Sequence, residues 1–190
     1  MRHTTPIVPE TLGADLRALR KSRGLTLSDL ALRLGRSVGW LSQVERDKSD
    51  PSISDLRQIA SCLGVPVSML FRHGAAPAEE AGYVVRRDAR RQIGSSAEGL
   101  IEALLSPDLT DDFEVVHSTF APHSRLKEPV CRPTQEVGYI ISGTLEIEIA
   151  GKLHRLDPGD SFRIRGETFR WANASDEPAV AIWVIAPPVY

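Results

Sequence analysis

A short run from Ser37 to Lys48 has residue types that could contact nucleic acid. It reads Ser-Val-Gly-Trp-Leu-Ser-Gln-Val-Glu-Arg-Asp-Lys. On a helical wheel with about 100° per residue, Leu41 and Val44 point to one side, while the residues nearly opposite are small, polar or cationic. Glutamine can bond a base edge through two hydrogen bonds, serine can bond bases or phosphate, and a valine methyl can contact thymine. The run is therefore suited to enter a DNA groove as a helix.

The turn before this helix supports the same interpretation. Gly35-Arg36-Ser37 would join two short helices at the distance typical of a helix-turn-helix, whose second helix enters the major groove. Arg36, Lys48 and the positive end of the helix dipole at Ser37 suit phosphates. Trp40 is expected to wedge between helices, because its wheel position lies nearer the core. The predicted DNA contacts are Arg36, Ser37, Val38, Gly39, Ser42, Gln43, Arg46 and Lys48.

Apolar spacing of three and four residues predicts that helices position this run. Thr26, Ser37 and Ser52 are candidate N-caps, while Asp29 and Asp55 stand three positions after two of them, as in a capping box. Gly24, Gly35 and Gly64 suit the left-handed position after a helix end. Five helices are predicted, at about 11–22, 27–34, 38–46, 53–63 and 67–72.

Beyond Gly82 the hydrophobic period changes to two. Val137–Ile141 and Leu145–Ile149 alternate, and turn signals stand at Ser142-Gly143, Ala150-Gly151 and Asp157–Asp160. Eight to ten such runs predict a closed barrel or a double-sheet jelly roll. Two upstream segments, 83–87 and 99–105, are expected to add outer strands.

Composition and charge limit the classes of protein. The chain has 190 residues with 42% hydrophobic and 25% charged residues, and we find neither a membrane-spanning run nor a signal peptide, so a cytoplasmic location is expected. Cys62 and Cys131 are expected to be free thiols. Residues 10–75 hold ten Arg and Lys against seven Asp and Glu, whereas residues 76–190 hold twelve against eighteen. The basic first half is therefore the part expected to meet a polyanion.

The helical half resembles the Cro/C1-type (XRE) helix-turn-helix family over about 65 residues. The resemblance rests on Leu25-Thr-Leu-Ser-Asp-Leu-Ala31, Trp40–Arg46, Asp50-Pro-Ser-Ile53 and Leu63-Gly-Val65, together with Gly35 and Ile59-Ala60. The resemblance implies that Arg20 pairs with Glu45. The glutamine that often begins the second helix of this family and touches phosphate is Leu27 here, so that contact is not expected.

Residues 113–186 resemble the cupin family. The carrying segments are Gln135–Gly143, Leu156–Phe162 and Gly166–Asn173, of which the Pro-Gly-Asp turn is the most specific. Cupin enzymes usually hold a metal with histidines and a glutamate; this chain keeps the glutamate at Glu136, but the two histidine positions fall on Arg132 and Phe169. Because a guanidinium and a hydrocarbon cannot replace imidazole ligands, no metal and no cofactor are expected. The remaining histidines of this half are not spaced as a cluster of metal ligands; they are His117, His123 and His154.

An altered cupin pocket could still hold a small molecule. Arg132 could bind a carboxylate or phosphate, and Glu136 could bind an amine. The other residues expected to line this pocket are Tyr139, Phe169 and Cys131, with Trp171 as a further candidate. In the alternative, Arg132 and Glu136 pair with each other and cap a packed barrel. Arg86, Arg87, Arg90 and Arg91 could hold DNA or bind the acidic half, although a solvated strand edge is the simpler interpretation.

These expectations describe a two-domain chain. An all-α, five-helix Cro/C1-type domain at 10–72 is followed by a linker at 73–82 and an all-β cupin barrel (double-stranded β-helix or jelly roll) at 83–190, with its core at 113–186. The expected function is transcription regulation, in which the helical domain of a homodimer binds operator DNA and the barrel senses a small effector, with no membrane partner and no enzyme activity. Two alternatives stay open: a metal-dependent cupin enzyme with a DNA-binding appendage, and a barrel that only dimerises.

Overall fold

The computed structural model describes residues 11–65, 67–70, 79–80, 82–93, 99–107, 109 and 111–189. These residues divide into two compact units, one ending at Arg91 and including Pro107 and Leu109, the other comprising 92–106 and 111–189. Of the linker expected at 73–82, residues 73–78 and 81 lie outside the described residues. The domain ranges 10–72 and 83–190 stay predictions. No helix among the described residues is both long and apolar enough to cross a bilayer.

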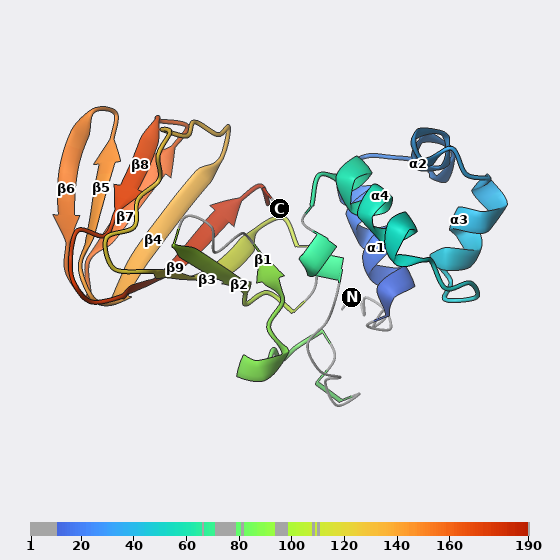
Figure 1. Ribbon diagram of the computed structural model, residues 1–190, viewed down its shortest axis with the longest axis horizontal. Coiled ribbons are helices and arrows are strands. Elements are labelled where there is room, and N and C mark those ends of the chain that lie inside the picture. Colours follow the sequence, from blue (N-terminus) through green and yellow to red (C-terminus); the bar gives the residue numbers. More distant parts are fainter. Residues whose placement is uncertain are drawn as a thin grey trace, which may run out of the picture. The chain divides into compact units, whose positions relative to one another are not determined.

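The first unit is helical (Figure 1). Its α-helices, among the described residues, are α1 (Leu12–Ser22), α2 (Leu27–Leu34), α3 (Val38–Val44) and α4 (Ile53–Leu63). The predicted fifth helix at 67–72 is not confirmed, because Val67–Leu70 forms one turn of 3-10 helix. Four residues are too few to complete an α-helical hydrogen-bond ladder, and Phe71 and Arg72 lie outside the described residues.

Side-chain caps fix where the helices begin and end. The predicted N-caps Thr26, Ser37 and Ser52 all accept a backbone N–H from the first turn of their helices, and Thr26 and Ser52 form capping boxes with Asp29 and Asp55. Gly35 and Gly64 take the left-handed conformation at helix ends. Gly24, which follows the C-cap Arg23 of the first helix, also takes the predicted left-handed conformation, with φ +66°.

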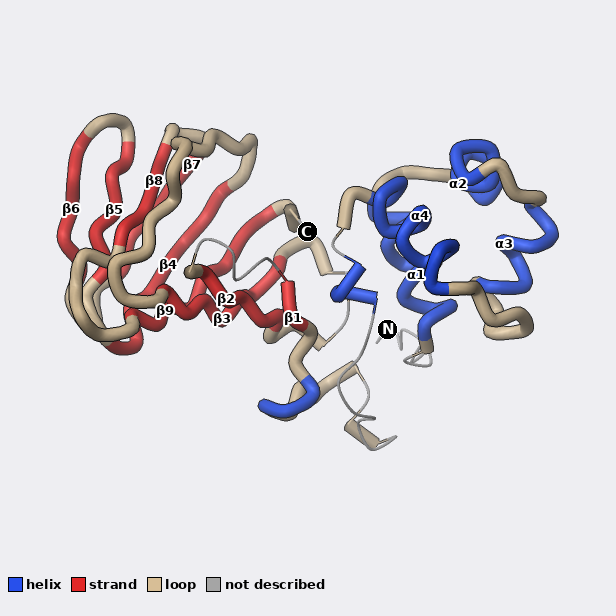
Figure 2. The backbone as a smooth tube through the Cα atoms, viewed as in Figure 1, coloured by secondary structure: helices blue, strands red, loops and turns tan. Residues whose placement is uncertain are grey.

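The second unit contains two antiparallel sheets (Figure 2). One has the strand order β1-β2-β3-β9-β4-β7 and the other the order β6-β5-β8. The strand bounds are β1 Gln92–Ile93, β2 Leu100–Leu104, β3 Glu114–Phe120, β4 Gln135–Ser142, β5 Leu145–Ile149, β6 Lys152–Leu156, β7 Ser161–Arg165, β8 Phe169–Ala172 and β9 Ala179–Ala186. This is the double-sheet arrangement of the predicted jelly roll, with the strand number inside the predicted range.

Of the two segments predicted to add outer strands, one is confirmed and one is wrong. Residues 99–105 contain β2, but 83–87 form no strand and run into a 3-10 helix at Arg87–Ala89. A backbone hydrogen bond from Tyr83 to Glu80 bends the chain there, which prevents an extended strand.

Aromatic rings fill the space between the two sheets. Phe120 of β3 meets Trp171 of β8 edge-on at 4.7 Å, and Trp183 of β9 lies 4.8 Å from Phe162 and 5.9 Å from Phe169 between ring centroids. A Cβ atom at position 138 would lie only 2.1 Å from the Phe162 ring, so Gly138 leaves room for this ring. The core of the unit therefore lies between the sheets, with Leu145 and Ile147 fully buried beside the rings.

Candidate functional site

The third helix presents the surface that the wheel predicted. Leu41 and Val44 are buried at 0% and 1% exposure, while Val38, Gly39 and Gln43 are exposed. Ser37 caps the helix by accepting the Trp40 N–H at 3.1 Å, and Gly35 provides the left-handed turn with φ +62° that separates α2 from α3. The small and polar side of α3 is thus open to a partner.

Two predicted cationic contacts lie just after the helix rather than in it. The helix ends at Val44, and Asp47 turns the chain with φ +55°. Arg46 Nε donates to the Ser42 carbonyl at 3.0 Å, and the Lys48 N–H donates to the Gln43 carbonyl at 2.9 Å. The first bond holds the Arg46 guanidinium against the last turn of α3, and the second holds the backbone of Lys48 there.

Arg36 is less free than predicted. Its guanidinium forms an ion pair with Asp55, and it lies over the Trp40 ring at 5.0 Å. Hydrogen bonds from Ser52 and then from Arg36 lower the pKa of the Asp55 carboxyl. Arg36 therefore links the turn to the start of α4, and half of its side chain stays exposed. Trp40 is partly exposed beneath it, which fits a wedge better than a base contact.

The pair that the family resemblance implied is present and buried. Arg20 Nε and Nη2 donate to the two Glu45 oxygens at 2.6 and 3.0 Å, and Nη1 donates to the Leu25 carbonyl at 2.7 Å. The hydrogen bond to Glu45 raises the pKa of the arginine. This bidentate pair fixes α1 against the residue that ends α3, and so sets the orientation of the exposed helix.

A second junction at the same place was not predicted from the sequence. Asp47 accepts hydrogen bonds from the Thr11 hydroxyl at 2.5 Å and the Gly13 N–H at 2.9 Å, so it covers the first turn of α1. A Cβ atom at Gly13 would lie 2.5 Å from the Val44 carbonyl oxygen. The signal in the sequence was a glycine inside the first turn of an amphipathic helix.

Two of the predicted ligand residues in the second unit are not placed to act together. Glu136 is fully buried, and both of its oxygens are occupied: the Thr134 hydroxyl donates at 2.6 Å and the Trp183 Nε1 donates at 2.8 Å. Tyr139 lies on the opposite face of the sheet from Glu136, because side chains alternate along β4. The expectation that Tyr139 lines the same pocket is therefore wrong.

Arg132 and Phe169 do lie together. The Arg132 guanidinium is 5.9 Å from the centre of the buried Phe169 ring, and it forms no ion pair with Glu136 or with any other described residue. Cys131 is exposed, with its thiol 3.3 Å from the Gly166 carbonyl oxygen. The alternative in which Arg132 and Glu136 pair directly is thus not what the structure contains.

Two carboxyl groups that face inward, those of Glu102 and Glu114, were not predicted from the sequence. Burial raises the pKa of Glu114 to about 7 and also raises the pKa of Glu102, while the charge of Arg132 opposes the rise at both. Glu102 accepts a hydrogen bond from Ser118, and Glu114 accepts one from the Val189 N–H at 3.1 Å. The alternation along β2 and β3 places both glutamates among the inward positions. That placement could have revealed them from the sequence, since charged residues rarely occupy inward positions unpaired.

No three His, Cys, Asp or Glu side chains gather as metal ligands within the part of the chain that the structure describes. His123 instead faces Asp176 at 2.9 Å on the surface, His154 is exposed and His117 is half-buried.

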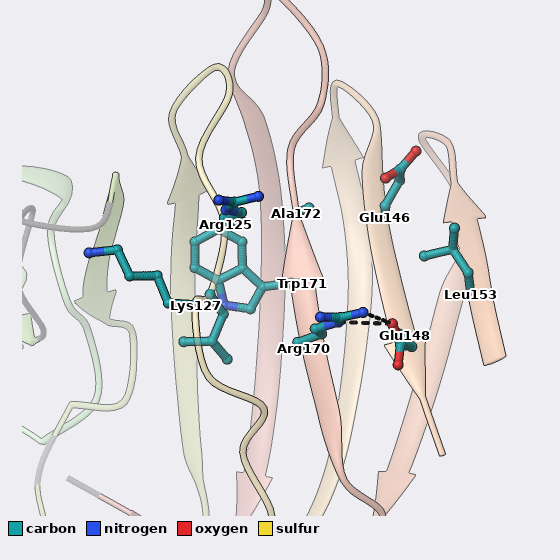
Figure 3. A pocket seen from close by; sticks show the side chains of 9 residues that line it. Arg125, Lys127, Glu146, Glu148, Leu153, Arg170, Trp171 and Ala172 are labelled. Atoms are coloured by element: carbon teal, nitrogen blue, oxygen red, sulfur yellow. Dashed lines mark hydrogen bonds and ion pairs between the residues drawn. The ribbon is translucent and has the colours of Figure 1, made fainter. Parts of the chain in front are cut away.

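Two surface hollows adjoin the sheets. One of about 470 Å³ is lined by Pro133, Gln135, Arg165, Gly166 and Pro187, next to Arg132 in the chain. The other, of about 390 Å³, lies on the outer face of the three-stranded sheet, where Arg170 donates to Glu148 and Arg125 and Lys127 stand on the neighbouring segment (Figure 3). Charged side chains predominate around the second hollow, whereas Arg165 is the only charged residue among those that line the first.

The arginine cluster at 86–91 does not form one surface. Arg91 is buried, donating to Asp15 Oδ2 at 2.7 Å and to the Met69 carbonyl at 3.2 Å, whereas Arg86 pairs with Glu80 on the surface. Arg87 is exposed. A solvated strand edge, the simpler interpretation from sequence, is wrong for Arg91, because no strand forms there and Asp15 neutralises its charge.

Known proteins resemble this chain in both units. Residues 11–70 match a helix-turn-helix domain model, and residues 116–185 match a cupin domain model. The HTH-type transcriptional regulator PuuR of Escherichia coli (strain K12) is 26% identical over 155 residues, 80% of this chain and 81% of PuuR. The transcriptional regulator ClgR of Mycobacterium tuberculosis is 29% identical over 102 residues, 53% of this chain and 91% of ClgR. The crystal structure of an HTH_3 family transcriptional regulator from Vibrio cholerae is 24% identical with a TM-score of 0.46, over 93% of this chain and 95% of that chain.

Proposed function

The chain is a transcriptional regulator that joins a helix-turn-helix domain of the XRE type to a cupin domain, and from this premise we propose that α3 reads operator DNA while the cupin unit senses a small effector. The observation that carries the first part is the exposed side of α3, on which Val38, Gly39 and Gln43 lie open while Leu41 and Val44 are buried. A helix whose buried side is anchored and whose open side is small and polar can approach base edges closely. A cytoplasmic location fits this function.

Phosphate contacts around α3 come from several groups. Ser37 stands at the helix N-terminus, and Arg46 and Lys48 lie at its other end, where the Arg46 side chain and the Lys48 backbone N–H donate to carbonyls of the last turn. Arg36 contributes with the half of its side chain that Asp55 and Trp40 leave exposed. One such helix contacts only a few base pairs, so a homodimer on two half-sites supplies the specificity.

Selection of DNA tests this proposal directly. The full-length chain is incubated at low ionic strength with a pool of random duplexes, and the retained sequences are read. We expect two similar, inverted half-sites whose centres lie about 34 Å apart or a multiple of that distance. Retention without any enriched sequence, or no retention, overturns the proposal.

Effector sensing rests on the Arg132 region. Arg132 is partly exposed, lies over an aromatic ring and has no ion-pair partner among the described residues, so its planar fork is available to a carboxylate or phosphate. Glu136 serves as support, because Thr134 and Trp183 already occupy its oxygens. We propose no catalytic residue and no metal ligand.

A thermal-shift screen of small carboxylates and phosphates on the full-length chain tests sensing. A hit should raise the melting temperature, change the affinity for the selected duplex, and lose its effect in Arg132→Met but not in Arg163→Met, an exposed arginine on β7. A hit that acts equally on both variants removes Arg132 from the site.

A barrel that only dimerises is the second candidate. The observation that favours it is the aromatic filling between the sheets, where Phe162 occupies the space above Gly138. If no compound shifts the melting temperature while the chain still selects a paired operator, this second candidate replaces sensing.

A further inference from the structure

The carboxyl group of Glu114 on β3 is buried and only half satisfied. Its side chain is 1% exposed, and the Val189 N–H donates to Oε1 at 3.1 Å. The other oxygen, Oε2, is also buried and has no hydrogen-bond partner among the described residues. Leaving a buried carboxyl oxygen unpaired is unfavourable, so a hydrogen-bond donor from outside the chain would be stabilised at this atom.

Glu114 projects into the space between the two sheets. It lies on the same side of β3 as Phe120, whose ring meets Trp171 of the opposite sheet. Ile185 of β9 pairs with Glu114 on one side and with Glu136 on the other. The two glutamates therefore stand in one inward row, two strands apart, and of the two only Glu114 has an oxygen left without a partner.

Arg132 brings a positive charge into the same interior. Its guanidinium lies 5.9 Å from the centre of the Phe169 ring, which is buried on the inward side of β8. It forms no ion pair with any described residue, although carboxyl groups stand on the neighbouring strands. The donors of this guanidinium are therefore available to a ligand as well.

Four charged groups act on one another in this interior. Burial is the main cause that raises the pKa of Glu114 to about 7, and the hydrogen bond from the Val189 N–H opposes the rise. Among the side chains, the charges of Glu102 and Glu136 raise this pKa further and the charge of Arg132 lowers it. One cation thus stands among three carboxyl groups and pairs with none of them, so the interior favours a ligand that brings a positive charge.

Water reaches this interior beside Glu102 and Arg132. Glu102 faces inward on β2, where the Ser118 hydroxyl donates to it at 3.1 Å, yet its side chain is half-buried rather than buried. Arg132 is half-buried in the same way, although it lies against an inward aromatic ring. Inward side chains that keep contact with solvent give a small molecule a route to the space between the sheets.

We propose that the effector is an aminocarboxylate, whose carboxylate binds Arg132 and whose protonated amine donates to Glu114 Oε2. The planar guanidinium offers two parallel donors to a carboxylate, and an ammonium group offers three donors together with the positive charge that the carboxyl groups favour. Glu136 takes no part, because Thr134 and Trp183 occupy its oxygens. This inference rests on effector sensing at Arg132 and names the chemical class of the effector.

Binding of such a ligand releases a proton. About half of the Glu114 carboxyls carry a proton at pH 7 in the empty chain, because the pKa is about 7. The ammonium arrives already protonated, so the O–H bond of Glu114 breaks, the proton goes to the solvent, and the remaining carboxylate accepts a hydrogen bond from the ammonium. The affinity should therefore rise about tenfold from pH 6 to pH 8, as the protonated fraction of empty Glu114 falls.

Titration calorimetry of the full-length chain tests this inference without a variant. The probes are the common α-amino acids and the linear ω-amino acids of three to six carbons. Each is compared with the matching alkanoate, which lacks the amine, and the matching alkylamine, which lacks the carboxylate. At least one aminocarboxylate should bind at least tenfold more tightly than both matched probes. Its apparent enthalpy at pH 6.5 should differ between buffers of different ionisation enthalpy, as release of roughly 0.8 proton requires.

Two glutamine variants locate the amine. Glu114→Gln keeps the shape of the side chain but removes its charge, so it should weaken the bound aminocarboxylate at least tenfold and abolish the proton release. Glu128→Gln, at an exposed position, is the matched control and should retain both. Circular dichroism and the melting temperature establish that the variants fold. Arg132→Met should weaken the aminocarboxylate and the matching alkanoate alike.

The inference is overturned if no aminocarboxylate binds, if none binds better than its matched alkanoate, or if Glu114→Gln binds as tightly as the wild-type chain. A carboxylate or phosphate that depends on Arg132 but not on Glu114 also overturns it, while the sensing proposal stands. Conversely, an aminocarboxylate that binds with proton release but leaves the affinity for the selected duplex unchanged supports this site and contradicts sensing.

Discussion

Arg91 and Asp15, 76 positions apart in the chain, form a buried ion pair of 2.7 Å in the helical unit. Both side chains are less than a tenth exposed, and Arg91 also donates to the Met69 carbonyl. Gln92, the residue after Arg91, begins β1. The ion pair therefore fixes Arg91, the residue before this strand, against α1.

Replacing Arg91 with Met should destabilise the helical unit by about 3 to 5 kcal/mol, because Asp15 would be left as a buried carboxylate without its guanidinium partner. Urea unfolding followed through Trp40 fluorescence in a Trp171→Phe, Trp183→Phe background measures this. Arg87→Met, at an exposed neighbour, should change the free energy of unfolding by less than about 0.5 kcal/mol. Equal losses in the two variants would show that the ion pair is not responsible.

Arg20→Ala should cost the helical unit a similar amount, about 3 to 5 kcal/mol, since it removes a bidentate partner from the buried Glu45. Arg17→Ala, at an exposed position in the same helix, is the control. An unchanged midpoint of urea unfolding for Arg20→Ala would contradict a structural role for the pair.

Two glycines of the helical unit should respond to alanine in opposite directions. Gly13→Ala should destabilise by more than about 1 kcal/mol, because the new Cβ would overlap the Val44 carbonyl oxygen. Gly39→Ala meets no atom within 4 Å and should stabilise α3 by about 0.5 to 1 kcal/mol while weakening DNA binding. Thermal melts and duplex titrations of both variants distinguish the effects, and a stabilised Gly13→Ala would refute the close approach of α1 and α3.

Gln43→Ala should weaken binding to the selected duplex by about 1 to 3 kcal/mol and leave binding to a shuffled duplex nearly unchanged, because a base contact is lost and phosphate contacts remain. Fluorescence anisotropy at fixed salt measures both affinities. Gln58→Ala, at an exposed position on α4, should behave as wild type. An equal loss on both duplexes would remove Gln43 from the residues that read bases.

Glu114 should make the stability of the cupin unit depend on pH. Burial raises its pKa to about 7 from the ordinary 4.5, so the folded chain keeps a proton that the unfolded chain has released between these values. The free energy of unfolding should therefore fall as the pH rises from about 4.5 to about 7, and the raised pKa of Glu102 acts in the same sense.

Glu114→Gln should reduce this slope and raise the stability above pH 7, measured by urea unfolding through Trp171 and Trp183 in a Trp40→Phe background. Glu128→Gln, at an exposed position, should retain the wild-type slope. A slope that Glu114→Gln leaves unchanged would assign the titration to another group.

Local signals in the sequence were sufficient for most of the elements. Four helices, their caps at Thr26, Ser37 and Ser52, and the alternating strands β4 and β5 were predicted, because caps and periodicity involve residues within one or two turns of each other. The bent backbone at 83–87 was not predicted, since it depends on a hydrogen bond that the alternation of residues does not reveal.

The sequence by itself determined which residues of α3 face outward and that Leu41 and Val44 face inward, because helical geometry converts spacing directly into direction. Only the tertiary structure decided that Asp15 neutralises Arg91, that Trp183 and Thr134 occupy Glu136, and that Arg132 stays apart from it. These partners lie on separate elements, and which charges meet depends on how helices and sheets pack, which no local pattern encodes.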